Sequence, residues 1–492
     1  MTLAYDALFI GGQWVPPAEN KPITVVSAST EEPLGQVPEA SRADVDAAVA
    51  AARTAFDDPT GWSRWEPARR AEALQSLATA LDKRSQEIAQ RVSSQNGMPI
   101  AVSQQLEGVF PATLLRYYAG MVADREPEER RPGLFGGTTL VRREPIGVVG
   151  AIVPWNFPQT LAAFKYAPAL AAGCTVVIKP SPETVLDSYL LAEAIEEAEL
   201  PAGVVNIVTG GRDVGAYLVS HPGVDKVAFT GSTAAGRQIG ETCGRLLRPV
   251  TLELGGKSAA IILDDADLDL GAVAQNLFGA TLLNNGQTCY LSTRILAPRS
   301  RYTQIVDTVT SFVESLTVGD ALDPDTQIGP MASAKHRAHV EGFIAQGRAE
   351  GATVTVGGGR PSQLDKGWFV EPTVFADVDN GFSVAREEIF GPVLSLIPYA
   401  DVEEAVRIAN DSDYGLGGTI WTSDPERAVQ VARRVQTGTI GINNYLPDPT
   451  APFGGVKASG MGRELGPEGL AAYEQQQSIY LDPAASATQN EA

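Results

Sequence analysis

Short apolar runs alternate with segments of helical periodicity between Ile146 and Leu254. Strands that alternate with helices predict a parallel sheet with helices on its faces, and such sheets bind ligands beyond the carboxyl ends of their strands. The predicted strands are Ile146–Val153, Thr175–Ile178, Val204–Val208, Lys226–Phe229 and Val250–Leu254, and the predicted helices are Val185–Ala198, Val214–Ser220 and Ala234–Leu246.

Other patterns flank this region. Phe9-Ile-Gly-Gly-Gln-Trp14 is typical of a β-hairpin, and apolar positions every three or four residues from Arg42 to Ser94 predict helices. A second alternating region runs from about Ser258 to Gly460. The small, polar residues after Asp482 predict a frayed tail.

Length and composition indicate an ordinary globular protein with more than one domain. The chain has 492 residues, whereas single cores stop growing near about 300. Apolar residues make up 44% and the formal net charge is -21, which disfavours nucleic acid and anionic membranes as partners. The longest apolar run, Leu161–Ile178, contains Lys165, Pro168 and Gly173 and predicts a helix, a turn and a strand.

Three cysteines without a CxxC pair fit a reducing compartment, and the first residues do not resemble a signal peptide, so a cytoplasmic location is expected. Cys174 and Cys243 lie in apolar or helical runs and are interpreted as structural. Cys289 follows Asn284-Asn-Gly-Gln-Thr, where Gly286 permits a sharp turn. A catalytic thiol needs exposure and a lowered pKa, so this segment alone leaves a nucleophile and a buried structural cysteine equally open.

A nucleophilic cysteine needs a base. Among the histidines His221, His336 and His339, the last two could form a zinc pair, but a solvated helix face is the preferred interpretation and no metal is expected. Glu253 ends a predicted strand and is a candidate base, but from this segment alone an ordinary strand-end glutamate is the preferred interpretation. Gly231-Ser-Thr-Ala-Ala-Gly236 could bind phosphate or merely cap a helix.

Taken together, the motifs of the chain resemble the aldehyde dehydrogenase superfamily from about Phe9 to Leu481. Seven short motifs occur in the family's order, which makes coincidence improbable. They are Pro154-Trp-Asn-Phe-Pro158, Lys179-Pro-Ser181, Phe229-Thr-Gly-Ser232, Glu253-Leu-Gly-Gly-Lys257, Gly286-Gln-Thr-Cys289, Glu388-Ile-Phe-Gly-Pro392 and Pro452-Phe-Gly-Gly455.

The resemblance implies a mechanism. Cys289 would attack the aldehyde carbonyl, and the oxyanion would be held by the Asn156 amide and the Cys289 backbone N–H. Hydride transfer to a nicotinamide would leave a thioester, which water activated by Glu253 would hydrolyse. Lys165 and Glu464 match positions that support ionisation of the nucleophile and the base.

The resemblance also implies a dinucleotide site. Trp155 and Ser232 would meet the pyrophosphate, Lys179 the adenosine ribose, and Glu388 the nicotinamide ribose. Phe390 is a further expected cofactor-binding residue. The spacing of Gly231 and Gly236 matches the family's phosphate loop. NAD is the expected cofactor. NADP stays possible because the glutamate that often binds the ribose is absent: Pro182 stands in its place, and Glu183 follows one residue later.

The expected substrate is an apolar aliphatic or aromatic aldehyde, because apolar Phe157, Leu161 and Phe164, together with Tyr290, match tunnel positions of the family. Two alternatives stay open. A coenzyme A-acylating enzyme would resolve the thioester with a thiol, and the presence of Glu253 disfavours it. A non-catalytic structural or binding protein on this fold is disfavoured by the presence of Cys289, Asn156 and Glu253.

The implied architecture is α/β, with a Rossmann-like dinucleotide-binding domain, an α/β catalytic domain and a small β oligomerisation element. The expected boundaries are 1–122 with 142–252, then 253–451, then 123–141 with 470–482 (the strand itself near Gln477–Leu481), and a tail at 483–492. A strand in the small element could extend a neighbour's sheet, so a homodimer or homotetramer is expected.

Overall fold

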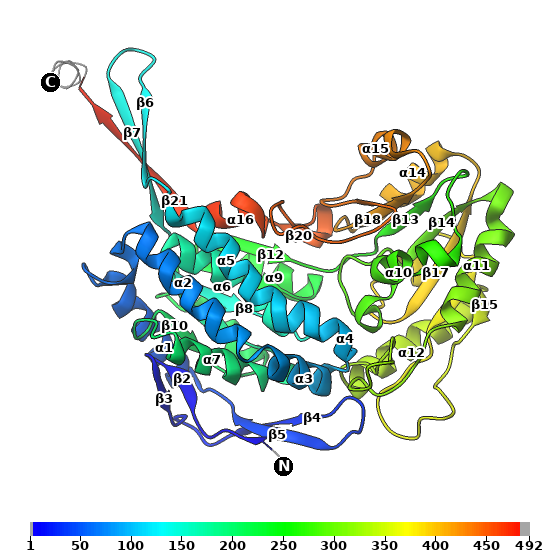
Figure 1. Ribbon diagram of the computed structural model, residues 1–492, viewed down its shortest axis with the longest axis horizontal. Helices are drawn as coiled ribbons and strands as arrows, with labels where there is room; N and C mark the ends of the chain where they lie inside the picture. Colours follow the sequence, from blue (N-terminus) through cyan, green and yellow to red (C-terminus); the bar gives the residue numbers. More distant parts are fainter. Residues whose placement is uncertain (1–2, 483–492) are drawn as a thin grey trace.

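The predicted alternation of strands and helices folds as an eight-stranded sheet in the computed structural model, which describes residues 3–482 (Figure 1). Its five central strands are parallel, as predicted, and each falls within its predicted segment or one residue beyond it. They are β8 (Val148–Ile152), β9 (Thr175–Lys179), β10 (Val205–Ile207), β11 (Lys226–Thr230) and β12 (Val250–Glu253).

Both edges of this sheet recruit distant segments. The hairpin β2 (Leu8–Ile10) and β3 (Gln13–Val15) forms as predicted and pairs with β10. At the other edge, β20 (Gly460–Met461) pairs antiparallel with β12, giving the order β20-β12-β11-β8-β9-β10-β2-β3. The chain just before Glu464 is thereby fixed beside Glu253, because Gly460 lies opposite Glu253 in the register.

Helices cover both faces of the first sheet (Figure 1). They are α1 (Arg42–Asp57), η1 (Trp62–Arg64), α2 (Pro67–Asp82), α3 (Ser85–Asn96), α4 (Ile100–Ser103), the π-helix η2 (Gln104–Val109), α5 (Phe110–Ala123), α6 (Pro158–Ala172), η3 (Pro182–Thr184), α7 (Asp187–Glu197), α8 (Arg212–Ser220) and α9 (Thr233–Arg245). The predicted helices agree with these bounds to within three residues.

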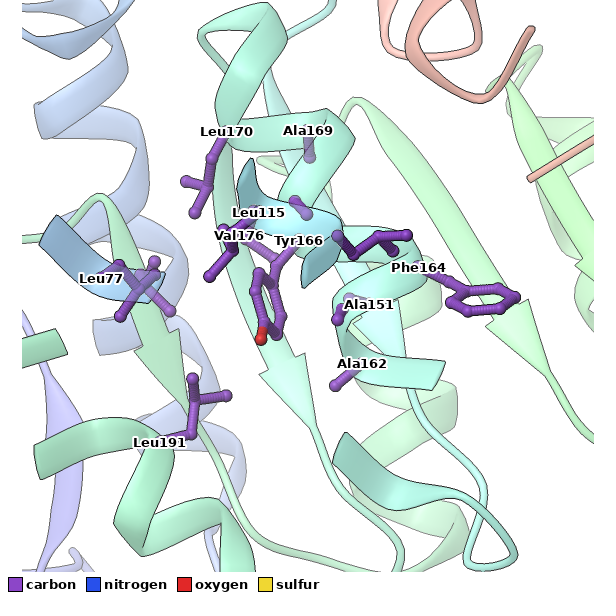
Figure 2. Close-up of a cluster of buried hydrophobic side chains, with 14 of the residues drawn as sticks. Leu77, Leu115, Ala151, Ala162, Phe164, Tyr166, Ala169, Leu170, Val176 and Leu191 are labelled. Carbon is purple, nitrogen blue, oxygen red and sulfur yellow. The ribbon is translucent and has the colours of Figure 1, made fainter. Parts of the chain in front are cut away.

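The main core lies between α6, its neighbouring helices and the sheet. Leu77 of α2, Leu115 of α5, Leu170 of α6 and Leu191 of α7 are each at most 1% exposed and converge on Val176 of β9 (Figure 2). Figure 2 also shows Phe164 of α6 pointing away from this cluster. One side of α6 therefore packs into this core, while Phe164 extends from another side of the same helix.

The second alternating region forms a seven-stranded sheet in the order β15-β16-β17-β14-β13-β18-β19. Its strands are β13 (Ala259–Ile262), β14 (Arg294–Pro298), β15 (Thr353–Val356), β16 (Thr373–Ala376), β17 (Val393–Tyr399), β18 (Gly418–Trp421) and β19 (Gly441–Ile442). Its helices are α10 (Leu270–Thr281), η4 (Leu283–Gly286), η5 (Arg299–Arg301), α11 (Tyr302–Glu314), α12 (Ala334–Ala349), α13 (Ser383–Arg386), α14 (Val402–Asn410) and α15 (Pro425–Ala432).

A three-stranded arm projects from the body, formed by β6 (Glu128–Pro132), β7 (Thr138–Pro145) and the C-terminal β21 (Glu474–Leu481) (Figure 1). The predicted C-terminal strand thus starts three residues earlier than Gln477. A further sheet of β1 (Leu3–Ala4), β5 (Pro33–Pro38) and β4 (Pro22–Val26) was not predicted.

Two short elements, η6 (Lys457–Ser459) and α16 (Gly466–Ala471), complete the fold. Within residues 3–482, no helix has the length and apolar content to cross a bilayer. The predicted tail at 483–492 lies outside the described residues.

Candidate active site

A cavity of about 800 Å³ brings together side chains of the first sheet and of the helices and loops that surround the second. Cys289, Asn156 and Glu253 all line it, although they lie far apart in the sequence. Glu253 ends β12, Asn156 lies between β8 and α6, and Cys289 follows η4. The three residues proposed for catalysis from the sequence therefore share one enclosed space.

The loop that carries Cys289 has an unusual backbone. Asn284, Asn285 and Gly286 have φ values of 52°, 59° and 75°, a left-handed run in which asparagine and glycine are the best tolerated residues. A side chain at Gly286 would place its Cβ 2.2 Å from the Gly391 carbonyl oxygen. Gly286 is therefore required both for its conformation and for its close packing.

Side-chain hydrogen bonds hold this strained turn in place. The Asn284 amide donates to the backbone carbonyl of Asn156 at 3.0 Å, and the Asn285 amide donates to the carbonyl of Gly97 at 2.8 Å. Sequence reasoning did not single out these two asparagines. The Asn-Asn-Gly run was the available signal, because these residue types favour positive φ.

The thiol of Cys289 does not have the lowered pKa expected of a catalytic cysteine. Burial raises the pKa of Cys289, and the negative charges of Glu388 and Glu253 raise it further. Among the described residues, no cationic side chain lines the cavity to oppose this effect. The resting nucleophile is thus the neutral thiol, and attack requires transfer of its proton to a base.

Asn156 is well placed to hold an oxyanion beside Cys289. It is only 4% exposed, and its Nδ2 donates to the Gln287 carbonyl at 3.0 Å, which leaves one of its two N–H bonds for another acceptor. The backbone carbonyl of Asn156 accepts hydrogen bonds from the side-chain amides of Asn96 and Asn284. These contacts fix the amide before substrate arrives, as electrostatic preorganisation requires.

Glu253 lies in a buried acidic cluster. It is 2% exposed, and neither carboxylate oxygen has a hydrogen-bond partner among the described residues. Burial raises the pKa of Glu253 well above its ordinary value, and the nearby charge of Glu464 raises it further, while Lys165 opposes both effects. A carboxyl group in this environment can take up a proton near neutral pH, as a general base must.

Lys165 and Glu464 form a buried ion pair behind Glu253. The Lys165 ammonium donates to Glu464 Oε1 at 2.9 Å and to Thr230 Oγ1 at 2.6 Å, and both charged side chains are at most 1% exposed. β20 holds the segment that leads to Glu464 against β12, so this ion pair depends on the pairing of these two strands.

Glu388, expected to meet a nicotinamide ribose, lies near the nucleophile. The Gly256 N–H donates to Glu388 Oε1 at 3.1 Å, and a Cβ on Gly256 would lie 2.4 Å from the Cys289 carbonyl oxygen. Burial raises the pKa of Glu388 to about 7, and Lys257 partly offsets this. The Gly255-Gly256 pair lets the chain pass between the thiol loop and this carboxylate.

Trp155 and Phe390 pack edge to face, with ring centroids 5.3 Å apart. His336 joins them: its ring lies 5.1 Å from Trp155, and its Nε2 donates to the Phe390 carbonyl at 2.6 Å. The interpretation of His336 as part of a solvated helix face was wrong, because tertiary packing turns its ring into this cluster. Burial lowers the pKa of His336 to about 4, so it is neutral at physiological pH.

The proposed phosphate and adenosine residues lie at the carboxyl ends of the parallel strands. Ser232 is the N-cap of α9, where its Oγ accepts from the Ala235 N–H at 3.3 Å, and Gly231 and Gly236 flank it. Lys179 ends β9 and donates from Nζ to the carbonyls of Pro180 and Gly210. A helix N-terminus and a lysine with a third N–H to offer suit a dinucleotide.

The predicted tunnel residues Phe157, Leu161, Phe164 and Tyr290 all line the cavity. Phe110, Tyr445 and Phe453 also line it and were not predicted. Tyr445 stacks on Tyr290 with centroids 4.4 Å apart, and the Phe453 ring meets Phe164 edge-on at 6.2 Å. Only tertiary structure brings these distant aromatic residues to one wall.

Comparison with known proteins agrees with this geometry. The model of the Aldehyde dehydrogenase family matches residues 14–479. Geranial dehydrogenase of Castellaniella defragrans is 59% identical over 481 residues, covering 98% of this chain and 100% of that protein.

Solved structures are similar over nearly the full length. A Mycobacterium tuberculosis aldehyde dehydrogenase complexed with NAD+ has a TM-score of 0.95 at 48% identity, covering 98% of this chain and 99% of that one. A mutant of aldehyde dehydrogenase C from Pseudomonas syringae, in complex with NAD+ and octanal, has a TM-score of 0.92 at 39% identity, covering 96% of each chain. The chain therefore belongs to the aldehyde dehydrogenase family.

Proposed function

We propose that this aldehyde dehydrogenase oxidises neutral, apolar aldehydes to carboxylic acids with NAD. One observation carries the choice of substrate: among the described residues that line the cavity, Glu253 is the sole carboxylate, and there is no lysine, arginine or histidine. A charged substrate group would be buried there without a counter-ion, which is costly. The relatives named for geranial and crystallised with octanal act on or bind aldehydes of the proposed kind.

The residues of the site define the steps. The Cys289 thiol gives its proton to a water molecule as its sulfur bonds to the carbonyl carbon. The carbon–oxygen double bond opens to an oxyanion, which accepts hydrogen bonds from Asn156 and the Cys289 N–H. When bound, the cofactor would supply a two-electron acceptor for the hydride that the former aldehyde carbon loses, which leaves a thioester on Cys289. Glu253 then removes a proton from water, whose oxygen bonds to the thioester carbon. The carbon–sulfur bond breaks, Glu253 returns the proton to the Cys289 sulfur, and the acid leaves.

The hydrolytic outcome is favoured over acyl transfer to coenzyme A by the position of Glu253. Its carboxylate lines the same cavity as the thiol and has an environment suited to a base. The buried ion pair of Lys165 and Glu464 acts on the charge of this carboxylate. Product analysis with coenzyme A present distinguishes the two: free acid supports hydrolysis, and an acyl thioester product overturns it.

A substrate panel tests the proposed class. With NAD, octanal and geranial are expected to exceed succinic semialdehyde and aminopropanal in kcat/KM by at least about 100-fold, the equivalent of about 3 kcal/mol. Equal or better turnover of the charged aldehydes would contradict the proposal. Cys289→Ala is expected to lose activity in every arm, while Cys243→Ala, at a buried cysteine outside the cavity, serves as the matched active control.

We also propose that the protein is a homodimer or homotetramer in the cytoplasm. β21 forms an edge of the three-stranded arm, and Leu134, Phe135 and Tyr480 on the arm are 92%, 97% and 82% exposed. An open strand edge and exposed apolar side chains favour association. The three cysteines are free, which fits a reducing compartment. A monomer by light scattering would contradict the assembly.

A further inference from the structure

Three positively charged features surround the place where the adenosine ribose is proposed to bind. The first is the ammonium of Lys179, which is 5% exposed and uses two of its N–H bonds on backbone carbonyls. The second is the N-terminus of α8, whose Gly215 packs on the Lys179 side chain. The third is Lys21, on the loop before β4. Alone, such a cluster would attract a phosphate group.

Glu39 neutralises two of these three features. One of its carboxylate oxygens accepts from the N–H of Gly211, the N-cap residue of α8, at 3.4 Å, and the other forms an ion pair with the Lys21 ammonium. The hydrogen bond and charge of Lys21 lower the pKa of Glu39, so its carboxylate is ionised at neutral pH. An acidic side chain therefore lies at the N-terminus of α8, where the helix would otherwise attract a phosphate.

Glu183 adds a second carboxylate near Lys179. It lies in η3, just beyond β9, and accepts a hydrogen bond from the Ser181 hydroxyl. Glu183 and Glu39 both act electrostatically on the Lys179 ammonium, so both lie within its neighbourhood. Pro182, which replaces the usual ribose-binding glutamate, is thus followed by an acidic residue that keeps this region negative.

We propose that Glu39, together with Glu183, makes the enzyme select NAD over NADP. This inference rests on the proposed placement of the adenosine ribose at Lys179. A 2′-phosphate, with a charge of about -1.5 to -2 at neutral pH, would enter beside two carboxylates and find the Gly211 N–H and Lys21 already engaged by Glu39. NAD has a neutral 2′-hydroxyl there and meets no such repulsion.

Glu39 contributes more than repulsion, and this makes its role separable from that of Glu183. Removing its charge frees Lys21 and the N-terminus of α8 to bind the phosphate, whereas removing the charge of Glu183 only relieves repulsion. Glu39→Gln is therefore expected to improve NADPH binding by a larger factor than Glu183→Gln. The Gln side chain can still accept from Gly211, so the local backbone keeps its hydrogen bond.

Direct binding measurements test the proposal independently of turnover. The dissociation constants of NADPH and NADH are measured by fluorescence titration of the wild type, Glu39→Gln, Glu183→Gln and the double variant. The double variant is expected to bind NADPH at least about tenfold more tightly, about 1.4 kcal/mol, with the NADH constant within about threefold. Glu32→Gln, at an exposed carboxylate paired with Lys366, is the matched control and should change neither.

Lys21→Met completes the design. In the wild type it should leave both constants nearly unchanged, but in the Glu39→Gln background it should remove part of the gain in NADPH affinity. Unchanged NADPH binding in the double variant, or an equal gain for NADH and NADPH, would overturn the inference. If Lys179→Met left NADH binding intact, the proposed position of the adenosine ribose at Lys179 would be wrong.

Discussion

Glu253→Gln separates the catalytic function of this carboxylate from its effect on stability. The wild-type side chain is buried without a hydrogen-bond partner among the described residues, and its pKa in the folded protein is raised above 4.5. The folded state therefore binds a proton more tightly than the unfolded state does. The contribution of this bound proton to the stability of the wild type is complete below the pKa of Glu253 in the unfolded state. It is lost as the pH rises towards the pKa of Glu253 in the folded state.

The size of this effect follows from proton linkage. One proton of difference between the two states changes the unfolding free energy by about 1.4 kcal/mol per pH unit. Glutamine does not titrate, so the stability of Glu253→Gln relative to the wild type should rise by up to about 3 kcal/mol between about pH 5 and about pH 7. Urea unfolding of both proteins across this range measures the difference.

The same variant should form the thioester but fail to hydrolyse it. Loss of a general base lowers turnover by about 10²–10⁴-fold. A burst of one NADH per active site should therefore precede slow turnover, and mass spectrometry should detect an acyl group on Cys289. Parallel pH dependences of stability in the two proteins, or a variant without a burst, would refute the reasoning about the buried carboxylate.

Two further substitutions probe the neighbours of the nucleophile. Asn156→Ala removes the preorganised donor and should lower the single-turnover rate by about 10²–10³-fold while leaving NADH affinity within about twofold, measured by rapid mixing and titration; a rate near that of the wild type would exclude Asn156 from the oxyanion site. Lys165→Met leaves Glu464 buried without its cation and should cost about 3–5 kcal/mol in urea unfolding. It should also move the acid limb of the pH–rate profile upwards, because Lys165 holds the pKa of Glu253 down; an unshifted profile would show that the pair does not act on the base.

The sequence determined much of the first sheet and the identity of the central residues. The alternation of apolar runs and helical segments placed β8 to β12 and their helices, because buried parallel strands and amphipathic helices carry strong local patterns. The Gly255-Gly256 pair and Gly286 marked positions where neighbouring atoms leave no room for a side chain, and Gly286 also has a positive φ. Resemblance to a known family then connected Cys289, Asn156 and Glu253.

Only the tertiary structure decided the environment of those residues. The pKa of Cys289 is raised rather than lowered, because burial and two nearby carboxylates depend on segments far apart in the chain. Likewise, His336 faces Trp155 and Phe390, and Glu39 reaches the N-terminus of α8, through packing that leaves no local signal. Desolvation and charge–charge interactions act through space, so a linear pattern can name the reacting groups but cannot fix their ionisation or their partners.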